Sequence, residues 1–355
     1  MRSILRDMYH CFLSRRATPT KARNALSALC HSYWKRRDVV GHYPISMTVC
    51  PGNVCNLRCA LCPTGTKASG RAPGLMSMEL FQKLMSECGP YLYDLELYNW
   101  GEPFLNKNVF AMAALAKTYN IRVTLSTNLN HFPEGTAEEV VASGIDRLVV
   151  SLDGASQESV EKYQTGSSFR DVVEHVRAIR AARRDAVSSS PLLIWRFLVN
   201  KHNEDELDLA RSAFGDFGFD RLEVGVFRVD MGRELFLSPS GQFELVRDWL
   251  PRDEALSMYN YSEMRRKIRP KRCFWLWSKA VVNWDGSVAP CCSVWPREYD
   301  FGSVAEQSFF DVWNGEKYRR ARAVLRGDGD PTGEGSLICT TCKANGAIIE
   351  CGGAL

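Results

Sequence analysis

The fold is decided by the stretch Val54-Cys55-Asn56-Leu57-Arg58-Cys59-Ala60-Leu61-Cys62-Pro63, which spaces three cysteines as C-x3-C-x2-C. Closed iron–sulfur sites use four cysteine ligands, so this compact set supplies three thiolates to a four-iron cluster and leaves one iron open to another ligand. A zinc site is the alternative. Zinc sites favour paired C-x2-C motifs completed by cysteine or histidine, and the nearest histidines, His42 and His131, lie outside this run.

Apolar strand-like runs alternate with helical segments from residue 44 onward. We expect strands over 45–49, 94–98, 121–126, 147–152, 192–199 and 222–226, and helices over 78–88, 108–118, 136–142, 168–184 and 204–214. This alternation predicts a parallel sheet with right-handed crossovers. Six units are too few for a closed eight-stranded barrel. We therefore expect an α/β fold, a partial (βα)6 barrel that binds its ligands at the carboxyl ends of its strands.

A second motif, Trp100-Gly101-Glu102-Pro103, follows the second expected strand. With the cysteine motif it resembles the radical S-adenosylmethionine (SAM) superfamily over about residues 44–230. The resemblance implies that Cys55, Cys59 and Cys62 hold a 4Fe–4S cluster whose open iron is chelated by SAM. One electron then cleaves SAM to methionine and a 5′-deoxyadenosyl radical, which removes a hydrogen atom from the substrate. It also implies that Gly101, Glu102 and Pro103 contact the methionine amino group.

Short polar side chains follow the later strands. The resemblance implies that Ser126, Asn128 and Ser151 line the SAM pocket and that Asn200 contacts the adenine or ribose. The alternative is that Asn128 and Asp153-Gly154 cap the helices that follow. Many family members have an aromatic residue just before the last loop cysteine, where this chain has Leu61, so adenine contacts must come from aliphatic surface and backbone.

A second cysteine group lies beyond residue 270. Cys273 is followed by twelve residues, Gly286, four more residues and Cys291, and the segment between the two cysteines predicts a β-hairpin with Asp285-Gly286 at its turn. With the C-x2-C pair Cys339 and Cys342, this arrangement resembles the SPASM/twitch extension of radical SAM enzymes, a small Cys-rich α+β domain. The resemblance implies one auxiliary 4Fe–4S cluster on Cys273, Cys291, Cys339 and Cys342. Zinc is the alternative occupant, because four thiolates also suit it.

Two cysteines of this region are left over. Cys292 adjoins an expected ligand, and we expect it to pack inward as a small apolar residue. Cys351 lies in a glycine-rich tail and has three interpretations: an alternate cluster ligand, a catalytic hydrogen-atom donor or an idle surface thiol. The general acid or base is not defined by any motif, and only Glu223 and Arg228, near the end of the last strand, are candidates.

Composition limits the class of protein. The 355 residues contain 45 Lys and Arg against 41 Asp and Glu, a net charge of +4, and no basic run is interleaved with aromatics, which argues against nucleic acid. Thirteen cysteines without an apolar signal segment or a membrane span of about 18 residues point to the cytoplasm and to metal cofactors. We expect a basic helical extension over 1–43, the barrel over 44–230, a connector over 231–270 and the iron–sulfur domain over 271–355.

The function expected from these patterns is that of a radical SAM oxidoreductase or epimerase. It would dehydrogenate or epimerise a sugar, cyclitol or related small molecule, with an electron donor such as flavodoxin or ferredoxin as partner. Radical modification of a ribosomally made peptide is the second interpretation. An iron–sulfur electron carrier or a zinc-scaffolded binding protein is the third, and it leaves Gly101-Glu102-Pro103 without a role.

Overall fold

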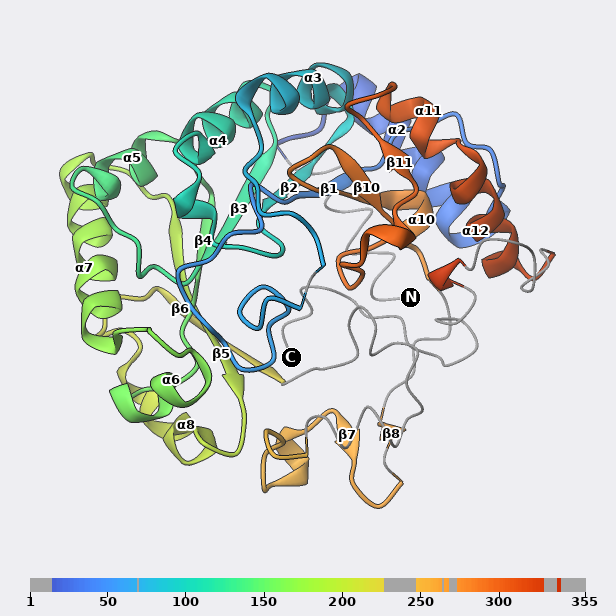
Figure 1. Ribbon diagram of the computed structural model, residues 1–355. Coiled ribbons are helices and arrows are strands. Elements are labelled where there is room, and N and C mark those ends of the chain that lie inside the picture. The colour runs from blue at the N-terminus through green and yellow to red at the C-terminus, as the bar shows by residue number, and fades with distance from the viewer. Residues whose placement is uncertain are drawn as a thin grey trace.

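A computed structural model describes residues 15–68, 70–226, 247–263, 265–267, 273–328 and 337–339. Within these residues, one curved sheet of nine strands has the order β11-β10-β9-β1-β2-β3-β4-β5-β6 (Figure 1). Its strands are β1 (Ser46–Val49), β2 (Asp94–Leu97), β3 (Arg122–Thr127), β4 (Arg147–Ser151), β5 (Leu192–Val199), β6 (Arg221–Val226), β9 (Lys279–Val282), β10 (Ser287–Ala289) and β11 (Gly302–Ser303). β7 (Tyr259–Asn260) and β8 (Arg265–Arg266) form a separate antiparallel pair.

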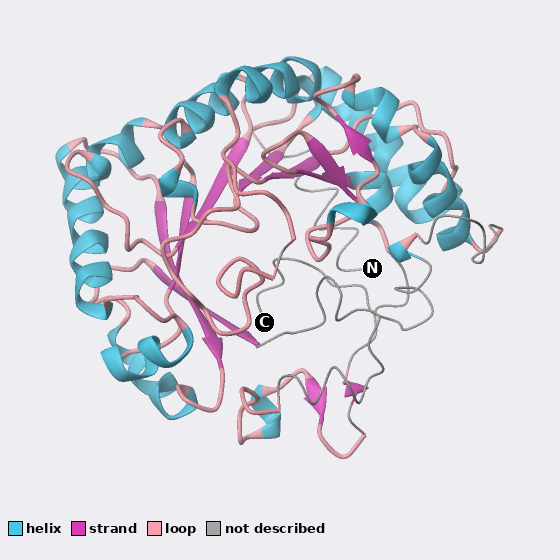
Figure 2. Cartoon of the chain, in the orientation of Figure 1, coloured by secondary structure: helices cyan, strands magenta, loops and turns pink. Residues whose placement is uncertain are grey.

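Helices cover the outer face of the curved sheet, and loops fill its concave side (Figure 2). The helices are α2 (Pro19–Cys30), α3 (Met78–Cys88), α4 (Val109–Thr118), α5 (Thr136–Ala142), α6 (Gln157–Tyr163), α7 (Phe169–Asp185), α8 (Leu207–Ala213), α10 (Trp275–Ser278), α11 (Phe309–Trp313) and α12 (Glu316–Arg326). A π-helical turn, η1 (His31–Lys35), continues α2. The 3₁₀ turns of the described segments are η2 (Gly89–Tyr91), η3 (Pro103–Leu105), η4 (Glu204–Glu206), η6 (Glu254–Leu256) and η7 (Arg297–Tyr299). The expected partial barrel is confirmed, since β1 to β6 are parallel and pair in sequence order.

The two faces of the barrel sheet differ in chemistry because side chains alternate along each strand. Outward residues such as Leu95, Leu97 and Trp195 are fully buried in the main hydrophobic core, where they pack beneath the helices. The residues between them, Glu96 and Arg196 among them, are polar and half-buried and lie on the inner face. An apolar outer face therefore drives folding and leaves the inner face available for polar functional groups.

The C-terminal strands extend the barrel sheet. β9 lies parallel to β1, with Ser46 opposite Lys279, and β10 returns antiparallel to β9. The hairpin predicted around Asp285-Gly286 is confirmed. Gly286 has φ of +83°, which favours glycine, and the Asp285 carboxylate accepts a 3.0 Å hydrogen bond from the Ser287 amide. The sheet thus runs without a break across the expected boundary between barrel and C-terminal domain.

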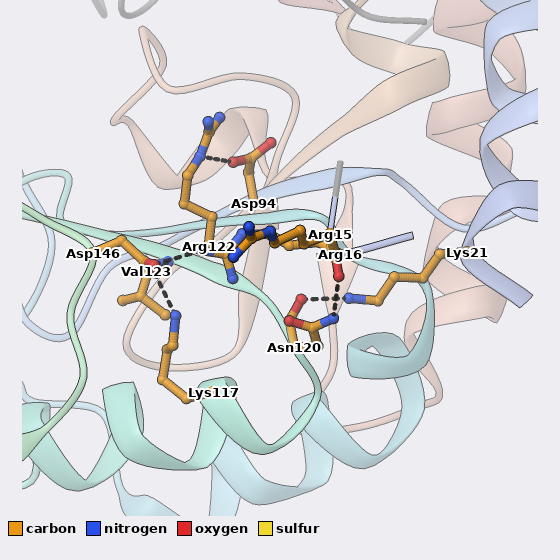
Figure 3. Close-up of polar contacts among 9 residues, drawn as sticks. All are labelled: Arg15, Arg16, Lys21, Asp94, Lys117, Asn120, Arg122, Val123 and Asp146. Carbon is orange, nitrogen blue, oxygen red and sulfur yellow. Dashed lines mark hydrogen bonds and ion pairs between the residues drawn. The ribbon is translucent and has the colours of Figure 1, made fainter. Parts of the chain in front are cut away.

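The N-terminal segment covers the amino ends of the barrel strands (Figure 3). Arg16 and Lys117 both pair with Asp146, at 2.5 and 2.6 Å, and the buried Lys21 ammonium donates to the carbonyls of Tyr119 and Asn120 at the end of α4. Burial lowers the pKa of Lys21 to about 8. Part of the basic charge of this segment therefore stabilises the barrel itself. None of the described helices is both long and apolar enough to cross a membrane.

Candidate active site

The cysteine loop follows β1 and lies at the carboxyl end of the barrel strands. Cys59 interacts electrostatically with both Cys55 and Cys62, so the three thiols lie close together. Burial raises the pKa of the Cys55 thiol to about 11 and that of the Cys59 thiol further still. Crowded, desolvated thiols such as Cys55 and Cys59 form thiolates only when a cation compensates their charge, which fits an iron cluster.

No group of three or more His, Cys, Asp or Glu side chains within the described ranges is arranged to hold a metal ion. In a cubane cluster each cysteine binds a different iron, so the thiolates need not converge on one point as they do around zinc. The loop itself is held from behind by the end of α6. The amides of Arg58 and Ala60 donate to the carbonyls of Thr165 and Tyr163, at 3.0 and 3.1 Å.

The Gly101-Glu102-Pro103 motif fastens the cysteine loop to the third strand. A Cβ at Gly101 would lie 2.2 Å from the Gly52 carbonyl oxygen, so only glycine permits this close approach. The Glu102 carboxylate is buried and accepts from the Thr127 hydroxyl at 2.6 Å and from the Asn128 amide at 2.7 Å. Its burial raises its pKa to about 7. Because both oxygens are used within the protein, the expected contact of this motif with SAM is left to its backbone.

The strand-end residues fall into two groups. Ser126 and Ser151 meet across adjacent strands, with their hydroxyl oxygens 3.3 Å apart. Asn128 reaches the cysteine loop, donating to Asn56 at 3.0 Å and to the Cys55 sulfur at 3.6 Å. The side chain of Asn200, by contrast, is buried and accepts from the His202 amide in its own turn, at 2.9 Å. The structure therefore brings Ser126, Ser151 and Asn128 toward the expected cofactor site.

A polar network crosses the inner face of the sheet. Thr48 donates to Glu96 at 2.7 Å, and the Tyr98 phenol is hydrogen-bonded to both Glu96 and Arg196. β2 and β5 are separated by two strands in the sheet, so a Tyr98–Arg196 contact must cross the concave side. Arg196 thus points into the barrel.

The same network ends at Glu223, a buried carboxylate on β6. Arg196 pairs with it at 3.1 Å and Arg147 at 2.7 Å. The Glu223 carboxylate therefore lies between two guanidiniums, an arrangement that suits binding and orientation of a polar group. The other candidate acid or base, Arg228, lies outside the described residues. Sequence reasoning missed Glu96, Tyr98 and Arg147, although the alternation of polar and apolar residues through Asp94–Leu97 places Glu96 opposite the outward Leu95 and Leu97.

The second cysteine group also assembles. Cys273 and Cys291 interact electrostatically, and the buried Tyr318 phenol interacts with both Cys291 and Cys339. Three of the four expected auxiliary ligands therefore surround one region, while Cys342 and Cys351 lie outside the described residues. Cys292 is buried, as expected, and is disulfide-bonded. The Tyr318 hydroxyl is buried without a hydrogen-bond partner, so it is placed to donate to a cluster sulfur or a cysteine thiolate.

The two cysteine groups are linked through the return limb of the cysteine loop. The buried Arg71 guanidinium donates to the Trp295 carbonyl at 2.5 Å and to the Ser287 hydroxyl at 3.1 Å, and pairs with Asp300 at 2.6 Å. These three residues belong to the hairpin region of the C-terminal domain, so the loop that carries the first cysteine group is anchored on the domain that carries the second.

Comparison with known proteins decides the family. The model of the radical SAM superfamily matches residues 49–210, and the model of the SPASM iron–sulfur cluster-binding domain matches residues 273–343. The chain belongs to the radical SAM superfamily. Radical SAM domains bind a 4Fe–4S cluster and SAM, and SPASM domains bind auxiliary iron–sulfur clusters, as expected from the two cysteine groups.

The proteins that are similar to this radical SAM enzyme have names that indicate different substrates. A Pyrococcus furiosus protein named as modifying the cofactor of tungsten-containing aldehyde ferredoxin oxidoreductase is 24% identical over 82% of this chain and 85% of its own. PqqA peptide cyclase of Granulibacter bethesdensis is 22% identical over 75% of this chain and 73% of its own. The structure of Streptococcus suis SuiB bound to S-adenosylmethionine superposes with a TM-score of 0.59, at 13% identity, over 92% of this chain and 78% of SuiB. The last similarity concerns the fold.

Proposed function

We propose that this radical SAM enzyme oxidises or epimerises a small polar substrate, such as a sugar, a cyclitol or an amino-cyclitol, held against the inner face of the barrel. When bound to Cys55, Cys59 and Cys62, the cluster supplies the electron that cleaves SAM into methionine and the 5′-deoxyadenosyl radical that takes hydrogen from the substrate. An auxiliary 4Fe–4S cluster on Cys273, Cys291, Cys339 and Cys342 would accept the electron left on the substrate. Flavodoxin or ferredoxin would serve as the reductant.

The observation that carries the substrate class is the inner-face network. A barrel interior packed only for stability is dominated by branched aliphatic side chains. Here Glu96, Tyr98, Arg196 and Glu223 offer donors and acceptors of both charges. Hydroxyl and amino groups of a small substrate can replace individual contacts of such a network, and a site of this kind rejects analogues that leave its polar groups unpaired. The residues of this chain therefore bind and orient the substrate.

The proposed contacts with SAM come from side chains at the strand ends and from the backbone behind the cysteine loop. Ser126 and Ser151 stand at the ends of neighbouring strands and suit the ribose or carboxylate of SAM, while Asn128 supports Cys55. The backbone of Gly101, Glu102 and Pro103 lies behind the cysteine loop and would meet the amino group. Asn200 would act at most by shaping the turn after β5. Cys351 remains a proposed hydrogen-atom donor for the epimerase variant of the reaction.

The test is anaerobic turnover of the reconstituted enzyme with SAM and dithionite, with polyols, amino-cyclitols and synthetic peptides as candidate substrates. Release of 5′-deoxyadenosine should rise with a polyol or cyclitol. Arg196→Lys should lower this substrate-dependent release at least tenfold and leave slow, uncoupled SAM cleavage intact. Arg122→Lys is the matched control, because Arg122 also pairs with a carboxylate, Asp94 at 2.5 Å, but at the amino ends of the strands. Equal turnover of Arg196→Lys and the wild type would contradict the proposal.

Modification of a ribosomally made peptide is the second candidate, favoured by the similarity to PqqA peptide cyclase over three quarters of the chain. The same assay decides between the two. If only peptides stimulate deoxyadenosine release, and the peptide product shows a mass change, the small-molecule proposal is wrong and the peptide candidate stands.

A further inference from the structure

Arg322, on α12, is a buried cation; the Asp38 carboxylate acts on it electrostatically but is paired with Arg326, at 2.7 Å. Its side chain is fully inaccessible, and its Nε and Nη1 donate to the carbonyls of Leu276 and Asp38, at 2.7 and 2.8 Å. Within the described residues it forms no ion pair, and its Nη2 has no hydrogen-bond partner. Burial lowers its pKa to about 9, so the protein carries this charge at a cost. A buried charge of this kind needs a counter-charge nearby.

The aromatic surroundings of Arg322 connect it to the auxiliary cysteines. Its guanidinium lies over the rings of Trp313 and Tyr318, 4.6 and 5.1 Å from their centroids. The Tyr318 phenol in turn interacts with Cys291 and Cys339. Its hydroxyl has no hydrogen-bond partner. The cation therefore lies against an unpartnered donor that is close to the auxiliary cysteines.

A second guanidinium approaches from the N-terminal segment. Arg36 ends η1 with φ of +46°, a left-handed conformation that is unfavourable for arginine and that the surrounding contacts maintain. It lies 4.6 Å over the Trp277 ring and donates to the Cys273 carbonyl at 3.3 Å. Its charge therefore lies beside Cys273, one of the expected cluster ligands. Arg36 is thus bonded to the Cys273 carbonyl, and Arg322 to the Leu276 carbonyl within the short helix α10 that follows.

We propose that the buried Arg322 and the half-exposed Arg36 are counter-charges of the auxiliary cluster and hold its reduction potential high. The inference rests on the auxiliary cluster of the proposed function. A four-iron cluster with four thiolates is negatively charged and becomes one unit more negative on reduction. Nearby fixed cations favour the reduced form, and in a desolvated site this effect is little screened. A raised potential prepares the cluster to accept an electron from the substrate side.

The experiment is an anaerobic potentiometric titration of the reconstituted enzyme, followed by electron paramagnetic resonance. Arg322→Gln and Arg36→Gln each remove one positive charge. Arg319→Gln is the matched control, because Arg319 lies on the same helix but is exposed. At the wild-type midpoint potential, each test variant should show about a tenfold lower ratio of reduced to oxidised auxiliary cluster, equivalent to about 59 mV for one electron. Arg319→Gln should match the wild type, and the SAM-binding cluster should not shift in any variant.

Two further measurements separate the possible failures. Iron analysis of the wild type should give about eight irons per chain, and about four would overturn both the auxiliary cluster and this inference. With about eight irons present, an unchanged potential in Arg36→Gln and Arg322→Gln overturns the inference alone and leaves the proposed function standing. Should Arg322→Gln fail to fold, the half-exposed Arg36 decides the question. Tyr318→Phe, which removes only a hydroxyl, should lower the potential in the same direction if that hydroxyl donates to the cluster.

Discussion

Replacement of Arg71 by methionine should uncouple the cysteine loop from the C-terminal domain. The Arg71 and Asp300 side chains are 3% and 10% exposed, so their ion pair is shielded from water. Removal of one partner leaves a buried carboxylate without its guanidinium and the Trp295 carbonyl without its donor. Breaking a buried pair in this way costs about 3–5 kcal/mol. Methionine keeps most of the volume, so the loss reports the polar contacts rather than a cavity.

The assay is anaerobic thermal unfolding of the reconstituted protein at pH 8. An unfolding entropy of about 2.1 cal/mol/K per residue gives about 0.75 kcal/mol/K for a chain of this length, so Arg71→Met should lower Tm by about 4–7 °C. The double variant Arg71→Met/Asp300→Asn removes the stranded charge as well and should recover about 1–3 °C of this loss. An Arg71→Met protein that melts within about 1 °C of the wild type would refute the reasoning. So would a double variant whose loss equals the sum of the two single losses.

Three other outcomes follow from the same contacts. Glu102→Gln turns one of the two accepting oxygens into a donor, so either the Asn128 backbone amide or the pair Thr127 hydroxyl and Phe104 amide loses its acceptor. It should weaken SAM binding about tenfold in anaerobic equilibrium dialysis, whereas Glu138→Gln on the exposed face of α5 should not; equal affinities would argue against the clamp. Gly101→Ala forces the cysteine loop away from the Gly52 carbonyl and should halve the bound iron, with Gly41→Ala, which meets nothing within 4 Å, as the control; full iron content would contradict the packing argument. Burial lowers the pKa of His42 to about 4, so the neutral ring contributes stability that is complete above pH 6.5 and is lost as the pH falls toward 4. Between pH 6.5 and 4.5 this effect should lower the free energy of unfolding of the wild type by about 2–3 kcal/mol, and His42→Gln should not show this loss. A Tm difference between variant and wild type that is constant over this range would exclude the assignment.

The barrel strands could be predicted because their outward residues repeat with period two. Alternating apolar residues such as Leu95 and Leu97 predict a strand, and the helical segments between consecutive strands predict parallel pairing. The cysteine spacing and Gly101-Glu102-Pro103 then locate the cofactor end of the barrel. Helix α6, by contrast, was not predicted, since Val160 and Tyr163 are its only apolar residues.

The contents of the site depend on distances that no local pattern contains. Tyr98 meets Arg196 only because the sheet curves. Glu102 serves as a clamp because Thr127 and the Asn128 amide fold back onto it from another strand. Arg322 reads as an ordinary basic residue of an exposed helix, and nothing in the sequence around it indicates that its side chain is buried. Such residues are recognised only when the three-dimensional structure supplies their partners.

The pairing of β9 with β1 has a consequence for how this chain is made. Ser46 and Lys279 are neighbours in the sheet, yet the ribosome must add more than half of the protein after β1 before β9 exists. Until then the edge of β1 that β9 will occupy presents open amides and carbonyls, the kind of surface that recruits strands from other molecules. Contacts of such long sequence separation also form slowly. A protein truncated after β6 should therefore aggregate rather than fold, and complete synthesis of the chain should precede stable assembly of the first cysteine site.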